Sequence, residues 1–575
     1  MGFRSYNQGL GVIYMNIKTL VVFGAAFLLS MTHPVSAGVS MKNGNFFIGY
    51  TDMIYPGGFE PKIERVYNSK TTFDGIFGYG WGNEYEVYLT VSADGSVVVH
   101  EYGGGAENRF SPKAFDEKEL NKAVEMIADA ARKDGHFGNN DQLKDYKKNL
   151  RGNAFFRNDE WEKYRSKGVL KPRELSNNSQ LFSNRFSYQY ITKLPGFYIR
   201  TFDSGKVEKY NDKTGKLAKI QDKNGNFIEF TYGDDGKLEK LADNFTRKMF
   251  FKFNNTGKVK SIQGENSKEV VYEYNKLGEL ISSQDAEGNL YKFEYSKDER
   301  HNMTQIAYAD KTTMEISYYS PEQHDNVKSI RERDKTLTEY TYKSDPADNG
   351  HLSIEANVKD MSNKTLSSSK YEYYLRYKPD GQEWTYKLVS LLDGDRSETT
   401  YNECCGLPLL IKRGKEETSF QYDSKGHVTK KITPWETTEL KYDTKVSKVS
   451  RVEKYSKNSK KKKMEWSEFH YDDKGNLDFA KNSEGKGVKL IYDAHGRILS
   501  MVDHNKRVIN FKYNENSKPI EITDPSLGTI NVQYTNSGEI KKVDSKAGRK
   551  IALQVTAGFQ NLLDIIRPAG VTLSF

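Results

Sequence analysis

The chain has 575 residues, of which 36% are hydrophobic, 13% aromatic and 29% charged, so it is too long for one simple core and too aromatic for a disordered protein. Its net charge of +9 arises from 87 basic and 78 acidic residues mixed along the chain. No basic stripe with interleaved base-stacking aromatic residues occurs, which argues against a nucleic-acid partner. The 38 Tyr and 46 Gly residues favour β-structure over a helix-rich fold.

The N-terminus has the three regions of a secretory signal peptide. A charged start ending at Lys18 precedes the apolar run LVVFGAAFLLSM, and Val35-Ser36-Ala37 provides small residues for cleavage. We therefore expect residues 1–37 to be removed and the protein to be secreted, periplasmic or at the cell surface. An apolar run of about a dozen residues is short for a membrane span, so none is expected after removal, and an uncleaved anchor is the alternative. The pattern leaves the start open between Met1 and Met15.

Residues 38–112 are expected to form a non-repeated β domain. Tyr85, Val87 and Leu89 alternate with polar residues as in a strand, and glycine-rich turns separate such segments.

Residues 113–185 are expected to form a helical insert. Asp116 is followed three residues later by Glu119, which is typical of a helix N-terminus, and the apolar residues from Leu120 onward keep one helix face until about Asp134. Two further short helices are predicted around 143–150 and 161–164.

Residues 186–550 contain a repeat of 21 residues centred on a tyrosine. In the copy NFIEFTYGDDGKLEKLAD, Ile228, Phe230 and Tyr232 alternate with polar residues, and a glycine turn leads to a return strand. One hairpin cannot bury its face, so the copies must stack and share a sheet. The pattern predicts a mainly β fold, a hairpin array in a curved or spiralling sheet, with residues 551–575 as C-terminal strands. The repeat tyrosines are Tyr232, Tyr274, Tyr295, Tyr422, Tyr471, Tyr492, Tyr513 and Tyr534.

Acidic residues recur at the same 21-residue spacing as the tyrosines, and in some stretches this spacing is lost. Asp222, Asp243 and Asp285 keep step with the tyrosines, and a turn explains the first of them better than a calcium loop, because the glutamate that such a loop needs is absent. Longer hairpins are expected between about 300 and 400, and the SKNSKKKK segment at 456–463 is expected to be a loop at a hairpin tip. Tyrosines of successive repeats are expected to pack as a ladder of rings.

These residues resemble the RHS or YD-repeat family over nearly all of the mature chain. Tyr492-Asp493-Ala-His-Gly496-Arg497-Ile498 is close to the consensus repeat, and Ile63-x-Arg65-x-Tyr67 with Gly78-x-Gly80-Trp81 is similar to the domain that commonly precedes such repeats. The resemblance implies a bacterial, secreted β-shell that in toxin members encloses a C-terminal effector. The core motif of those members has only a faint echo at Asp524-Pro525. A short form without a C-terminal toxin domain is therefore expected.

Candidate chemistry is sparse in the sequence. Cys404 and Cys405 are neighbours, and in an exported chain a structural disulfide and free or intermolecular thiols are the alternatives. Neither the cysteines nor the scattered histidines have the spacing of a metal site. We expect no catalytic, metal-binding or cofactor-binding residues.

The sequence favours a secreted or cell-surface protein that acts in binding, adhesion or enclosure without catalysis. Tyrosine-rich strands can stack on sugars or pack on protein, so a glycan or a cell-surface protein is the expected partner. A carrier shell for a separately encoded toxin and a glycan-cleaving enzyme are the alternatives. Exposed strand edges would also permit oligomers.

Overall fold

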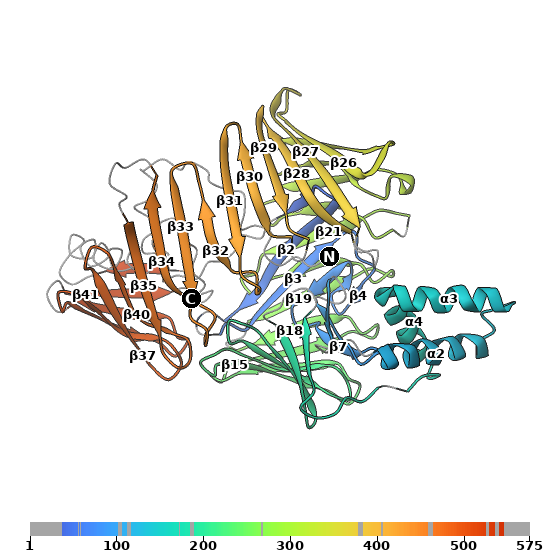
Figure 1. Cartoon of the computed structure of the whole chain (residues 1–575), viewed down its shortest axis with the longest axis horizontal. Helices are drawn as coiled ribbons and strands as arrows, with labels where there is room; N and C mark the ends of the chain where they lie inside the picture. Colours follow the sequence, from blue (N-terminus) through green and yellow to red (C-terminus); the bar gives the residue numbers. More distant parts are fainter. Residues whose placement is uncertain are drawn as a thin grey trace.

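The computed structural model describes residues 37–55, 57, 59–101, 106–111, 117–171, 173–183, 189–265, 268–298, 300–377, 383–403, 406–457, 464–524, 528–534 and 540–544. The predicted signal peptide, both cysteines, most of the lysine-rich loop and the expected C-terminal strands lie outside these residues. The described part is mainly β, with three α-helices, and its elements follow the chain in order (Figure 1).

The N-terminal strands are β1 (Gly38–Ser40), β2 (Asn45–Ile54), β3 (Lys62–Asn68), β4 (Asp74–Gly75), β5 (Gly78–Tyr79), β6 (Trp81–Asn83), β7 (Tyr88–Val91), β8 (Val97–Glu101) and β9 (Ala106–Ser111). The helices are α2 (Glu117–Lys133), α3 (Asn140–Gly152) and α4 (Ala154–Ser166), with a short 3₁₀ helix η1 (Pro321–Gln323) later in the chain.

The first half of the array comprises β10 (Gln180–Ser183), β11 (Tyr190–Leu194), β12 (Phe197–Thr201), β13 (Val207–Asn211), β14 (Leu217–Gln221), β15 (Phe227–Tyr232), β16 (Leu238–Asp243), β17 (Lys248–Phe253), β18 (Val259–Gly264), β19 (Glu269–Tyr274), β20 (Leu280–Gln284), β21 (Leu290–Tyr295), β22 (Met303–Ala307), β23 (Thr313–Tyr318), β24 (Val327–Arg331) and β25 (Leu337–Asp345).

The second half comprises β26 (Asp348–Lys359), β27 (Thr365–Tyr377), β28 (Glu383–Leu392), β29 (Asp395–Tyr401), β30 (Pro408–Arg413), β31 (Glu416–Tyr422), β32 (Val428–Ile432), β33 (Glu436–Tyr442), β34 (Val449–Ser456), β35 (Met464–Tyr471), β36 (Leu477–Asn482), β37 (Gly487–Tyr492), β38 (Ile498–Asp503), β39 (Val508–Tyr513), β40 (Pro519–Asp524), β41 (Gly528–Tyr534) and β42 (Ile540–Asp544). The long strands β25 to β28 confirm the longer hairpins expected in this region.

Each repeat is a hairpin whose turns are held by an acid or amide side chain. The Asp493 carboxylate accepts hydrogen bonds from the backbone N–H groups of His495 and Arg497, both at 2.9 Å. Gly496 takes a positive φ of 77°, a conformation that favours glycine. The acids that keep step with the tyrosines act in the same way. Asp222, for example, accepts from the N–H groups of Asn224 and Asn226, so the turn interpretation is confirmed.

One antiparallel sheet runs through the whole array. It has 36 strands, β7 to β42, each paired with the next along the chain. The described residues contain no ladder between β42 and β7, so the sheet is open. Its first strands curl back on themselves, because Tyr88 of β7 forms an isolated bridge with Lys216, next to β14. The remaining strands rise from β15 and β18 past β21 to β26 and β29, then return through β30 to β35 and down to β37 and β41 (Figure 1). The observed sheet confirms the predicted fold class.

The spiral meets itself at a seam between turns. The side-chain amide of Asn476, after β35, donates to Oδ1 of Asn224, after β14, at 2.8 Å, although 252 residues separate them. The side-chain amide of Asn226 likewise donates to the carbonyl of His495 at 2.9 Å. Both contacts join hairpin turns rather than strand edges. The sheet therefore encircles a central space after about 21 strands, and β2 and β3 lie inside it (Figure 1).

A four-stranded sheet, in the order β1-β2-β3-β6, packs inside the spiral. Its Arg65 is fully buried and forms an ion pair with Asp52 at 2.5 Å, and it also donates to Ser283 Oγ of β20 at 2.6 Å. The indole N–H of Trp81 donates to the Tyr295 hydroxyl at 3.0 Å. This sheet and the repeats therefore share one hydrophobic core, which extends to Ile330.

The helical insert confirms the three helices predicted from the sequence. One face of α2, from Leu120 to Ala131, is buried against α3 and α4. The Trp161 indole donates to the carbonyl of Val91 at 3.1 Å, and this contact attaches the insert to β7. The helices project from one side of the spiral, next to β7 (Figure 1).

Candidate functional site

The core-facing side of the spiral is packed at both ends and open in the middle. The first hydrophobic cluster ends with Ile330 of β24 and the partly buried Tyr340 of β25, and a second begins with Leu440 of β33 and Val449 of β34. Among the described residues, no side chain of β26 to β32 belongs to either cluster. The N-terminal segment contacts early strands such as β20, and it also reaches β28 through Lys42 and Glu383 and the turn before β40 through Glu60 and Lys518. The inner face of β26 to β32 is therefore less extensively packed than the regions on either side, although Ile354, Leu375 and Val389 are still buried.

Aromatic side chains lie along this inner face. Tyr342 of β25 stands opposite Ile354 of β26, which in turn stands opposite Tyr371 of β27. Tyr373, two residues further along β27, stands opposite Leu388 of β28. All three tyrosines are half-buried. Burial raises the pKa of Tyr342 and of Tyr373 above the usual range, so these two hydroxyls remain protonated donors over the physiological pH range.

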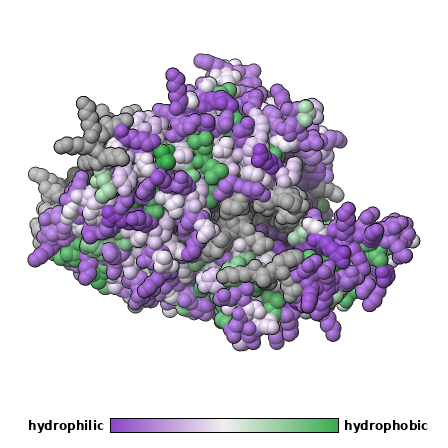
Figure 2. Space-filling view, viewed as in Figure 1, coloured by the Kyte–Doolittle hydropathy of each residue, from purple (hydrophilic) through white to green (hydrophobic). Residues whose placement is uncertain are grey.

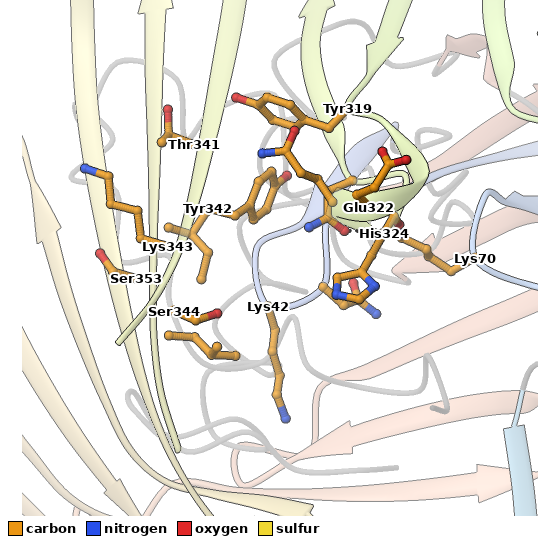
Figure 3. A pocket seen from close by; sticks show the side chains of 15 residues that line it. Lys42, Lys70, Tyr319, Glu322, His324, Thr341, Tyr342, Lys343, Ser344 and Ser353 are labelled. Carbon is orange, nitrogen blue, oxygen red and sulfur yellow. Dashed lines mark hydrogen bonds between the residues drawn. The ribbon is translucent and has the colours of Figure 1, made fainter. Parts of the chain in front are cut away.

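A cavity of about 690 Å³ lies where the N-terminal sheet stops covering the repeats (Figure 3). Tyr342 and Tyr319 contribute rings that lie 6.2 Å apart and almost perpendicular to each other, at 85°. Lys42 and Lys70 approach from the N-terminal domain, and His324 from the segment after η1. The volume falls within the range of small-molecule sites, roughly 300 to 1,000 Å³.

The cavity has one polar group without a partner and one poorly compensated charge. The Tyr342 hydroxyl is buried and has no hydrogen-bond partner within the described part of the chain. The Lys70 amino group donates to Asn326 Oδ1 at 3.0 Å and to the carbonyl of His324, and burial lowers its pKa. At the rim, Lys42 pairs with Glu383 at 2.6 Å. A ligand that accepts hydrogen bonds and carries negative charge would satisfy these groups.

The repeat tyrosines predicted from the sequence are structural residues. Each hydroxyl whose partner is shown donates to a backbone carbonyl of an earlier strand, as from Tyr492 to Leu477 at 2.6 Å and from Tyr513 to Ile498 at 2.7 Å. A register shift immediately before the tyrosine directs the ring toward that strand. The expected ring ladder is wrong for this pair, because no ring contact joins Tyr492 and Tyr513 in the described residues. The same hydroxyl bond occurs at Tyr232, Tyr274, Tyr295, Tyr422, Tyr471 and Tyr534.

The other candidate chemistry of the sequence is not brought together. Cys404 and Cys405 lie outside the described residues. Within the described ranges, no three His, Cys, Asp or Glu side chains are grouped as metal ligands. No described helix is long and apolar enough to cross a membrane.

Sequence reasoning did not find the cavity, because its residues come from three distant segments. Lys70, Tyr319 and Tyr342 each belong to an unremarkable local pattern. The only available signal was the loosened register between 300 and 400, which marks where the strands lengthen and the core ends.

Comparison with known proteins gives limited matches. Residues 36–110 match a family described as "Domain of unknown function (DUF6531)", which covers the N-terminal β domain. No curated protein matches. The chain is similar to a crystal structure of TcdB2-TccC3, with 12% identity, a TM-score of 0.39, and coverage of 96% of this chain and 32% of that one.

Two further structures show the same level of likeness. TcdB2-TccC3-Cdc42 has 12% identity and a TM-score of 0.40, with coverage of 87% of this chain and 29% of that one. A Tc holotoxin pore of Photorhabdus luminescens has 12% identity and a TM-score of 0.37, with coverage of 87% and 29%. The chain thus spans about a third of the length of these Tc toxin structures. At 12% identity the likeness concerns the fold alone.

Proposed function

We propose that this protein is a non-catalytic binding protein of the RHS or YD-repeat type that encloses part of its ligand inside the spiral. The observation that supports this proposal is the inner face of β26 to β32, which lies between two packed cores and carries half-buried tyrosines. A sheet that curls through a full turn and leaves aromatic side chains facing its interior has a concave surface for a partner.

A glycan is the ligand class that fits this surface best. Tyrosine rings can stack on sugar rings, and the cavity adds hydroxyl, amide and ammonium donors around Tyr342. The lysines favour a glycan that carries carboxylates. On the face of the molecule that Figure 2 shows, the surface is mostly hydrophilic with scattered apolar areas, which gives little support to a protein partner there.

Two observations favour binding over glycan cleavage. Among the described residues that line the cavity, Glu322 is the only carboxylate, whereas hydrolysis of a glycosidic bond normally uses two. A hydrogen bond from Ser320 lowers the pKa of Glu322, and a general acid needs a raised pKa.

The binding test is a screen of the mature chain against neutral and uronate-containing oligosaccharides, followed by titration of the best ligand. Tyr342→Ala should weaken binding about tenfold, the loss expected for one stacking ring. Tyr374→Ala is the matched control, since Tyr374 lies on the opposite face, stacked on His351. Equal losses in both variants, or no oligosaccharide binding at all, would contradict the proposal.

Export is part of the same proposal and rests on the sequence pattern that ends at Ala37. Intact mass of the exported protein tests it. A mature chain that begins far from Gly38 would show that the signal was misassigned.

A further inference from the structure

The seam between the two turns of the spiral contains two lysines of like charge. Lys223, in the turn after β14, donates from Nζ to the carbonyl of Gly475 at 2.6 Å across the seam. Lys448, in the turn before β34, comes into contact with Lys223 and is only 8% exposed. Burial and the neighbouring Lys223 charge together lower the pKa of Lys448 to about 7.

Nearby carboxylates do not neutralise this pair. Asp203 and Asp472 are close enough to attract Lys448, but among the described residues neither lysine forms an ion pair. Asp472 is occupied within its own turn, where its two oxygens accept from the backbone N–H groups of Lys474 and Asn476 and from the Asn476 amide. Asp203 lies 3.9 Å from His427, across the same seam. Closing the seam therefore brings two ammonium groups together, and the compensation is partial, from Asp203 and Asp472 and from the Tyr471 ring 5.8 Å from the Lys448 amino group.

We propose that Lys223 and Lys448 form a binding site for one small oxyanion, such as inorganic phosphate or sulfate, which holds the two turns of the spiral together. An anion with two negative charges would neutralise both lysines and accept hydrogen bonds from both ammonium groups. Without the anion, charge repulsion favours separation of the turns.

This arrangement makes closure of the spiral depend on anion concentration. The contacts at the seam are polar contacts between hairpin tips, such as those of Asn224 and Asn226, and polar loop contacts can open without loss of the core. The inference does not rest on the ligand proposed for the inner face.

The test is hydrogen exchange of the full chain at pH 6, in sulfate and in chloride of equal ionic strength. Peptides that cover 222–226 and 472–476 report the seam. Sulfate at ten times its dissociation constant should slow their exchange about tenfold, and peptides of the N-terminal sheet should not change.

Lys448→Met removes one of the like charges. In chloride, the amide hydrogens of the seam peptides should therefore exchange more slowly in this variant than in the wild type, and sulfate should have no further effect. Lys223→Met, on the other side of the seam, should behave in the same way and serves if the first variant does not fold. Lys474→Met is the matched control. Lys474 is an exposed lysine of the seam turn between β35 and β36, and its Nζ contacts the Ala494 carbonyl, so this variant should respond like the wild type.

A pH comparison adds a second readout. Sulfate keeps its charge between pH 6 and pH 9, whereas Lys448 loses its proton over this range, so the sulfate effect should be weaker at pH 9. His427 also titrates at the seam, where the neighbouring carboxylates of Asp203 and Asp423 raise its pKa, and Lys448→Met retains this group as a reference. Equal slowing by sulfate in the wild type and in both methionine variants would overturn the proposal, as would faster seam exchange of those variants in chloride.

Discussion

The buried pair of Arg65 and Asp52 offers a sharp test of how the N-terminal sheet is held in the spiral. Both residues are at most 2% exposed, and the guanidinium contacts the carboxylate at 2.5 and 3.1 Å. Asp52 also accepts from the Tyr272 hydroxyl at 2.7 Å. Burial raises the pKa of Asp52, which shows the cost of its charge in this core. Arg65→Met would leave that carboxylate without its counter-charge.

The expected loss for Arg65→Met is about 3 to 5 kcal/mol in the free energy of unfolding, the cost of an uncompensated buried charge. Asp52→Leu combined with Arg65→Met should recover at least about 2 kcal/mol of this loss, because the unpaired charge is then absent. Arg300→Met is the control. Arg300 is paired with Asp298 and Asp325 at the surface, so its loss should be about 1 kcal/mol or less.

Urea unfolding measures these free energies, and hydrogen exchange locates the change. Faster exchange is expected in β2 and β3 and in the facing β20, while β37 to β41 should be unaffected. If Arg65→Met lost no more than Arg300→Met, or if the double variant were as unstable as the sum of its parts, the charge argument would be refuted.

Two further predictions concern single residues. Tyr492→Phe removes the hydrogen bond to Leu477 and should lower the free energy of unfolding by about 1 kcal/mol. Tyr492→Ala also removes a half-buried ring and should lower it by about 3 kcal/mol, with faster hydrogen exchange confined to β35 to β41. Burial raises the pKa of Glu86 to about 8 from its ordinary value of 4.5, so the folded state favours the protonated carboxyl. The contribution of this group to the stability of the fold is therefore complete below about pH 4.5 and is lost as the pH rises through about 8. Glu86→Gln should flatten this part of the stability profile in thermal melts between pH 4 and pH 9, and an unchanged slope would contradict the assignment.

Much of the local structure followed from the sequence. The alternation of Ile228 and Phe230 with polar neighbours predicted a strand with one buried face, and both residues are buried. The apolar residues from Leu120 onward predicted α2, whose expected cap Asp116 lies outside the described residues, and the acids at equivalent positions of the repeats predicted turns. These features depend on residues within about ten positions of one another, where backbone geometry and side-chain alternation leave few alternatives.

The role of the repeat tyrosines could be predicted from the sequence only in part. Their spacing showed that they occupy equivalent places, and the structure confirms this, since Tyr492 stands opposite Ile498 and Tyr513 opposite Pro519. The sequence could not show that each hydroxyl reaches a carbonyl of an earlier strand. That contact depends on the register shift just before the tyrosine, and spacing alone does not reveal a bulge.

By itself, the sequence determined that this protein is an array of antiparallel hairpins with a helical insert, because each hairpin is specified by its own short pattern of apolar, polar and turn residues. Only the tertiary structure decided where the array meets itself at Asn224 and Asn476, where the N-terminal sheet stops and leaves Tyr342 beside a cavity, and which lysines face each other across the seam. The physical reason is that these contacts depend on small twists between neighbouring strands, summed over some twenty strands. The twist at any one strand is too small to be recognised in the sequence pattern of a single repeat.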